Sequence, residues 1–137
     1  MTSDERWLAA NWPFVRGSLP AAPARVAEVG CGPLGGFVPM MEAVGYQAIG
    51  VDPEAPPGPS YRQVEFERYG TAGRQDILDE LDARFDCRAV AYGPYFFAAL
   101  AGTSDADEQA AIDSGLIQAN RIQYVGRRKS PPLVPSA

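Results

Sequence analysis

Two acidic residues and the glycines between them are the part of this chain whose residue types and spacing suit chemistry. Glu28 stands two residues before Gly30, and Asp52 closes the next apolar run. Glycine has no Cβ, so it lets the chain turn sharply and lets backbone N–H groups approach a ligand. Gly30, Gly32 and Gly35 also match the GxGxxG spacing of dinucleotide-binding loops, although that spacing alone is a weak signal. We therefore expect a small-molecule site at this loop.

The charges of Glu28 and Asp52 discriminate between ligand classes. A carboxylate at Glu28 would face the diphosphate of a dinucleotide in a like-charge contact, whereas it would attract the ammonium group of a methionine moiety. Asp52 ends the following strand, so in a parallel sheet it emerges at the same edge as the loop and can hold both hydroxyls of a ribose. S-adenosylmethionine has the ammonium group and the ribose, and it carries no phosphate.

At these residues the sequence resembles the class I S-adenosylmethionine-dependent methyltransferases. The resemblance covers residues 25–57 and rests on the runs Val26-Ala27-Glu28-Val29-Gly30-Cys31-Gly32 and Gly50-Val51-Asp52-Pro53. It implies a cofactor-binding set of Glu28, Gly30, Cys31, Gly32, Gly35, Asp52 and Pro53. In this set the glycines line the cofactor, Glu28 orders the loop or reaches the amino group through water, and Asp52 holds the ribose.

The activity that the resemblance implies is methyl transfer from S-adenosylmethionine to a small-molecule acceptor. The chain contains no histidine, which excludes Ser-His-Asp, Cys-His and HExxH chemistry. Methyl transfer depends mainly on positioning the acceptor, so it is compatible with this absence. Candidate residues for an acceptor pocket are the aromatic side chains Trp12, Phe14, Tyr92 and Tyr95, for which core packing is the commoner role. No residue is assigned as catalytic.

Three other functions stay open. The chain can be a non-catalytic S-adenosylmethionine- or nucleoside-binding remnant that has lost its substrate half. It can be a small NAD-binding Rossmann oxidoreductase, which Glu28 disfavours, as does the lack of a tyrosine–lysine pair, because Lys129 is the single lysine. It can also be a structural fragment that binds nothing, with glycines that serve only the geometry of a turn.

Length and composition place the chain among ordinary globular proteins. Its 137 residues fit one domain, expected over residues 1–129, followed by a disordered, proline-containing tail at 130–137. The net charge of −5 argues against nucleic-acid and anionic-membrane partners. Cys31 and Cys87 suggest neither a disulfide framework nor a metal site, and no apolar run approaches a membrane span of about 20 residues. We therefore expect a cytoplasmic protein.

The elements that must position the site follow from periodicity and breaker residues. A strand at 25–29, the glycine turn, a helix at 37–44 and a strand at 46–51 make a βαβ unit, which forms a right-handed crossover in a parallel sheet. Other expected elements are helices at 3–11, 76–85 and 104–114, and strands at 62–69, in the first half of 87–97 and at 122–127. The predicted fold class is α/β, a Rossmann-like three-layer sandwich with a shortened, mostly parallel sheet of about five strands and an antiparallel C-terminal strand.

The stretch between the third strand and the end region is shorter than the family resemblance requires. Two further strands should stand there, but residues 70–84 predict only a loop and one helix. One side of the strand at 25–29 would then lack its partner, which is a liability in a buried parallel sheet. We expect residues 86–92 or 122–127 to pair there, with Val26 and Val29 covered on both faces by the helices at 37–44 and 76–85. An open edge would instead favour a homodimer or aggregation.

Overall fold

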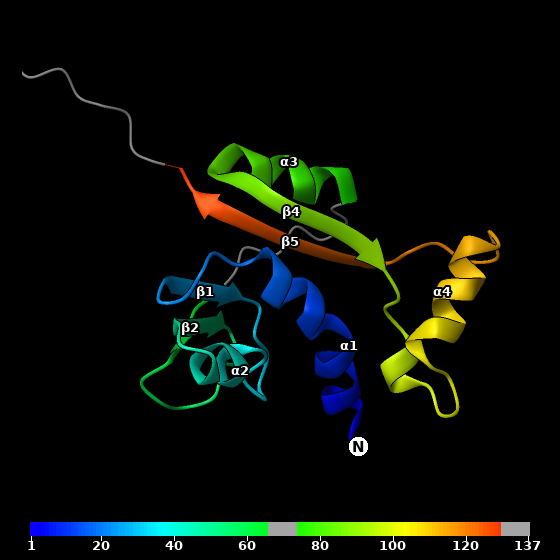
Figure 1. Cartoon of the computed structure of the whole chain (residues 1–137), viewed down its shortest axis with the longest axis horizontal. Helices are drawn as coiled ribbons and strands as arrows, with labels where there is room; N and C mark the ends of the chain where they lie inside the picture. Colours follow the sequence, from blue (N-terminus) through cyan, green and yellow to red (C-terminus); the bar gives the residue numbers. More distant parts are fainter. Residues whose placement is uncertain (66–73, 130–137) are drawn as a thin grey trace, which may run out of the picture.

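The computed structural model describes residues 1–65 and 74–129, and it divides their strands between two small sheets (Figure 1). The elements run in the order α1 (Ser3–Ser18), β1 (Arg25–Val29), α2 (Val38–Ala43), β2 (Gln47–Asp52), β3 (Tyr61–Gln63), α3 (Arg74–Arg84), β4 (Phe85–Gly93), the 3-10 helix η1 (Phe97–Ala99), α4 (Asp105–Asp113) and β5 (Arg121–Arg128). The α/β class is confirmed. The predicted tail at 130–137 and residues 66–69 of the third predicted strand lie outside the described residues.

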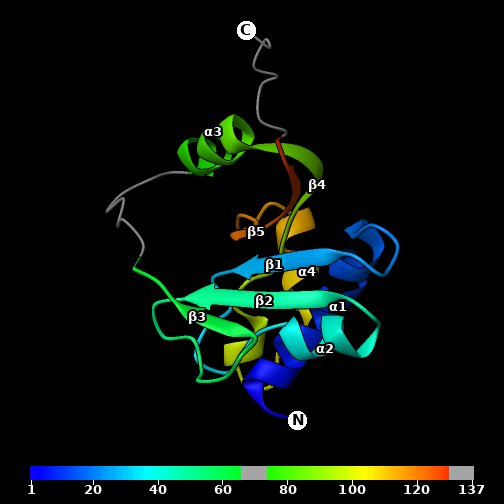
Figure 2. The same cartoon turned by 90° about the vertical axis from the view of Figure 1, so that its left-hand side faces the viewer.

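β1, β2 and β3 form a parallel sheet in that order (Figure 2). α2 connects β1 to β2, so the predicted βαβ unit is confirmed. The register places Glu28 beside Gly50 and Asp52 beside Gln63. Because side chains alternate between the two faces of a strand, Glu28 and Asp52 belong to the same face of this sheet.

The hydrophobic core lies on that face. Val38 and Met41 of α2 are buried against Tyr46 and Ala48, and Trp12 of α1 packs against the same cluster. The opposite face of β1 is exposed: Arg25 and Ala27 face solvent, and Val29 is 68% exposed.

The prediction that helices cover β1 on both of its faces is therefore wrong. α2 and α1 cover one face, whereas α3 packs against β4 and β5. The third layer of the expected sandwich is not formed by the described residues. α3 stays beside β4 and β5 because the chain passes directly from α3 into β4. Tyr124 of β5 also donates a hydrogen bond of 3.0 Å to Asp82 of the helix.

β4 and β5 form a second, antiparallel sheet, so the C-terminal strand is antiparallel as predicted but belongs to a separate sheet. The pairing extends from Phe85 opposite Arg128 to Gly93 opposite Arg121. Among the described residues β1 pairs with β2 alone, so the predicted pairing of β1 with a C-terminal strand is wrong, as is the single sheet of about five strands. The long antiparallel pair of nine and eight residues satisfies more backbone groups than either strand could satisfy against the five residues of β1.

Helix α1 packs on the core of the parallel sheet and is hydrogen-bonded to β5 of the antiparallel pair (Figure 1). The buried Asn11 side chain accepts hydrogen bonds from Arg121 and Gln123 of β5, each at 2.8 Å, and donates one to the Trp7 carbonyl. The helix starts at a Thr2–Glu5 capping box and continues through Pro13, beyond the predicted end at residue 11. Packing of Trp12 and its neighbours on the core outweighs the hydrogen bond that Pro13 cannot donate.

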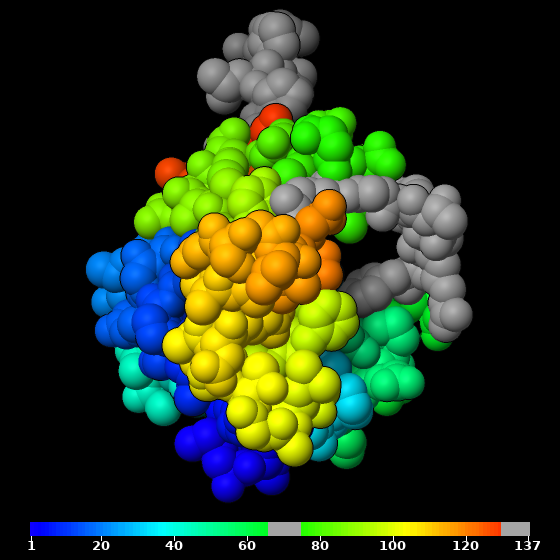
Figure 3. All heavy atoms as spheres, turned by 90° about the vertical axis from the view of Figure 1, so that its right-hand side faces the viewer, coloured from blue at the N-terminus to red at the C-terminus, as the bar shows by residue number. Residues whose placement is uncertain are grey.

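Helix α4 begins where the sequence predicts. Ser104 and Asp107 form the expected capping box, in which each side chain accepts a hydrogen bond from the other residue's backbone N–H. Figure 3 shows the surface formed by α4 and its flanking segments beside α1. Within the described residues no helix is long and apolar enough to span a membrane.

Candidate functional site

The glycine loop leaves the carboxyl end of β1 and is fastened to the end of β2. The Gly30 and Cys31 N–H groups both donate to the Val51 carbonyl, at 2.7 and 3.4 Å. Positive φ angles, which residues with a Cβ disfavour, occur at four glycines of the loop: Gly30, Gly32, Gly35 and Gly36. The run of glycines is thus a requirement of the backbone path itself.

The four glycines fall into two pairs with different surroundings. A Cβ built on Gly30 or Gly32 would meet nothing within 4 Å. A Cβ on Gly36 would lie 2.5–2.8 Å from the Glu28 carboxyl group, and one on Gly35 would collide with the Tyr61 hydroxyl. Gly35 and Gly36 are therefore explained by internal packing, whereas the side of the loop at Gly30 and Gly32 is open to an approaching molecule.

Glu28 lies beneath the packed side of the loop. Its Oε2 accepts a hydrogen bond of 2.7 Å from the N–H of Phe37, the residue that precedes α2. Burial raises the pKa of Glu28 to about 7; the hydrogen bond from Phe37 opposes this rise, and the nearby charge of Asp4 in α1 adds to it. The geometry agrees with a role for Glu28 in ordering the loop.

Asp52 ties the loop to the segment after β2. Its Oδ2 accepts from Gly32 N–H at 3.1 Å, and its Oδ1 accepts from Glu54 N–H at 2.8 Å. Each carboxylate oxygen has a second lone pair. The half-buried carboxylate can therefore hold the loop and still accept hydrogen bonds from a ligand hydroxyl.

Cys31 faces the interior. Its side chain is 7% exposed, and a Cβ on Gly50 would meet both its Sγ and the Tyr61 ring at 2.9 Å. Burial raises the pKa of the Cys31 thiol, with Glu28 and Asp52 adding to the rise. The side chain therefore packs beneath the loop, and only the backbone of Cys31 is placed to line a ligand.

The remaining predicted residues are spread over the molecule. Pro53 is exposed next to Asp52. Trp12 stacks on Phe37 with ring centroids 6.0 Å apart, which places it in the core near the loop. Tyr95 contacts Trp7 edge to face at 5.7 Å, and Tyr92 belongs to β4. Phe14 is half-buried on α1. The four aromatic residues therefore do not form one acceptor pocket at the loop.

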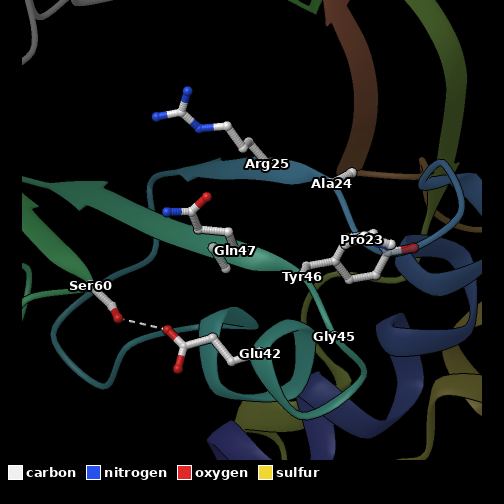
Figure 4. Close-up of a pocket in the computed structure, with 9 residues that line it drawn as sticks. Pro23, Ala24, Arg25, Glu42, Gly45, Tyr46, Gln47 and Ser60 are labelled. Atoms are coloured by element: carbon white, nitrogen blue, oxygen red, sulfur yellow. Dashed lines mark hydrogen bonds between the residues drawn. The ribbon is translucent and has the colours of Figure 1, made fainter.

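A cavity lies at the other end of the strands, where β1 and β2 begin. It has a volume of about 620 Å³ and is lined by the segment 23–25, the segment 45–48, Glu42 and Ser60 (Figure 4). Ser60 donates a hydrogen bond of 2.6 Å to Glu42 there. In open parallel sheets ligands bind at the carboxyl ends of the strands, so the glycine loop remains the better candidate site.

Two buried polar residues were not identified from the sequence. Asn11 is 1% exposed and joins α1 to β5. Glu108 is 5% exposed, and its carboxylate accepts hydrogen bonds from the N–H groups of Tyr95, Phe96 and Phe97 at 2.6–2.8 Å. Asn11 lies on α1 among alanines and aromatic residues, and Glu108 lies on α4 among other polar residues, so neither position shows by its type alone that it is buried. The partners of Glu108 and the β5 partners of Asn11 are more than ten residues away, so only the tertiary structure shows these contacts.

No family model, curated protein or solved structure matches the chain. The function is therefore inferred from the geometry of the site.

Asp52→Ala is expected to weaken binding of S-adenosylhomocysteine by about 1.5–3 kcal/mol, the usual size for hydrogen bonds to a charged group. It should also lower the free energy of unfolding by about 1 kcal/mol, because Gly32 and Glu54 lose their acceptor. Calorimetric titration and urea denaturation measure the two effects. Glu54→Ala is the matched control, since it removes an adjacent exposed carboxylate and keeps the backbone N–H. Equal affinity in all three proteins would remove Asp52 from the site.

Proposed function

We propose that this chain binds S-adenosylmethionine, or a closely similar nucleoside with a cationic end, at the glycine loop. The observation that carries the proposal is the open side of Gly30 and Gly32 between two carboxyl groups on one face of the sheet. Asp52 already holds the Gly32 N–H and would accept from the ribose, and Glu28 would attract the ammonium group.

Methyl transfer to a small-molecule acceptor is the catalytic form of this proposal. An acceptor must be held against the methyl group, which requires a second wall beside the cofactor. In the expected architecture the strands beyond β1 supply that wall, whereas β1 has an open edge among the described residues. This observation favours the alternative in which the chain binds the cofactor without transferring the methyl group by itself.

The ligand class is tested by titration with S-adenosylhomocysteine and NAD. We expect S-adenosylhomocysteine to bind and NAD not to bind, because the diphosphate would meet the Asp52 carboxylate and the acidic side chain of Glu28, and neither offers it a positive charge. Isothermal calorimetry with equal concentrations of each compound measures this. Tighter binding of NAD would reverse the assignment, and heat from neither compound would support a fragment without a ligand.

The edge of β1 that is unpaired among the described residues also offers a place for a second copy of the chain to bind. We propose that a second copy pairs there through an antiparallel contact of β1 with β1, centred on Ala27, which keeps the exposed faces of both strands on one side. Sedimentation velocity over a hundredfold concentration range should show a dimer. Ala27→Pro removes an edge N–H and should shift the population to monomer, while Ala43→Ser on α2 serves as a control. A monomer at every concentration would exclude this pairing.

A further inference from the structure

Glu28 is partly buried beside a second acid and two other groups that lose a proton when they ionise. The charge of Asp4 on α1 acts on Glu28. Burial is the largest cause that raises the pKa values of Cys31 in the loop and Tyr61 on β3. Glu28 adds to both rises, and Cys31 and Glu42 add more than Glu28 does at Tyr61. Asp52 at the end of β2 acts on the Cys31 thiol. Among the described residues this cluster contains no arginine, lysine or amino terminus.

The hydrogen bonding of Glu28 leaves one oxygen for a second partner. Phe37 N–H donates to Oε2, and this bond fixes the carboxyl group beneath Gly36. A buried carboxylate with one neutral donor and no cation is costly, so the neutral acid is favoured when the site is empty. A proton on Oε1 and a ligand cation at Oε1 would satisfy the same electrostatic demand.

We propose that the glycine loop takes up the cationic end of its ligand in exchange for a proton from Glu28. The inference rests on the proposed function and deepens it. The O–H bond of the neutral carboxyl group breaks, its proton passes to solvent, and the carboxylate that remains pairs with the ligand ammonium, which keeps its own protons. Charge at the site is thereby balanced before and after binding.

The pKa of Glu28 in the ligand-free protein sets the pH range of this exchange. With a pKa of about 7, Glu28 is roughly half protonated at neutral pH and almost fully protonated at pH 5.5. A ligand that requires the carboxylate should bind about tenfold more tightly for each pH unit between about 5 and 6, and its affinity should level off above about pH 7.5. The number of protons released per ligand should fall from nearly one to about one half between pH 5.5 and 7.

Calorimetry with S-adenosylhomocysteine tests the exchange, because the measured heat contains the ionisation heat of the buffer in proportion to the protons released. Titrations at pH 5.5, 6.5 and 7 in two buffers of different ionisation enthalpy give that number. Glu28→Gln should bind more weakly, with an affinity independent of pH and no proton release, since glutamine keeps an acceptor for Phe37 N–H. Glu42→Gln, an exposed acid at the opposite end of the strands, should behave as the wild type.

The possible outcomes separate the two proposals. No heat with S-adenosylhomocysteine overturns the proposed function and this exchange together. Binding without proton release overturns the exchange and leaves the proposed function standing. Proton release that persists in Glu28→Gln also overturns it, because another group, such as the Cys31 thiol, would then supply the proton.

Discussion

Gly32→Val is expected to lower the affinity for S-adenosylhomocysteine by at least about 100-fold, close to 3 kcal/mol. A valine Cβ at this position would project into the open space where backbone and ligand are proposed to meet, since nothing of the chain lies within 4 Å of it. The branched side chain would also displace the Gly32 N–H from Asp52. Calorimetric titration of the purified variant measures the loss.

The strain of valine at a positive φ must be separated from the loss of the site. Gly102 provides a matched control, because its φ of 72° is close to the 75° of Gly32 and its Cβ position is equally open. Both variants should lose about 1–2 kcal/mol of stability from the left-handed conformation. Only Gly32→Val should lose binding. Wild-type affinity in Gly32→Val, or an equal loss in Gly102→Val, would show that the loop does not contact the ligand.

The second large effect is the pH dependence of stability at Glu28. The folded pKa of about 7 lies above the ordinary value of 4.5, so the folded chain holds this proton more tightly than the unfolded chain does. The resulting stabilisation is fully present below pH 4.5 and is lost as the pH rises through 7. Relative to wild type, Glu28→Gln should therefore gain about 2–3 kcal/mol of unfolding free energy between pH 4.5 and 7.5, allowing for partial solvent access.

Urea denaturation at the two pH values measures this gain, and it requires no ligand. Glutamine keeps an oxygen for the Phe37 N–H, so the comparison isolates the ionisation of the carboxyl group. Glu42→Gln replaces an exposed acid and should differ from wild type by the same amount at both pH values. A constant difference for Glu28→Gln as well would show that Glu28 is not held in a buried acidic environment.

Local patterns were sufficient to predict most elements of the fold. The glycine turn, the helix after it and the strand that ends at Asp52 follow from residue types within one short segment, and so does the Ser104–Asp107 capping box. The extension of α1 through Pro13 was missed, because it depends on Trp12 meeting a core built from residues 38–48. Long-range packing overrode a local signal there.

The arrangement of the strands was less predictable than their existence. Pairing of β4 with β5 competes with pairing of either strand with β1, and the sequence of each strand alone does not rank these choices. At the site, Glu28 and Asp52 lie at the predicted edge, but the sequence did not show that Gly35 and Gly36 make room for Tyr61 and Glu28. Positive φ and internal contact are properties of the folded backbone.

The contacts of α1 with both sheets have a consequence for the order of assembly during translation. The segment 25–63 contains β1, α2, β2 and β3, so it can begin to pair as soon as it leaves the ribosome. Asn11 finds its partners only when Arg121 and Gln123 have been synthesised, more than 100 residues later. Trp12 can therefore pack on residues 38–48 early, whereas the side of α1 that carries Asn11 reaches its final contacts only when β5 is present.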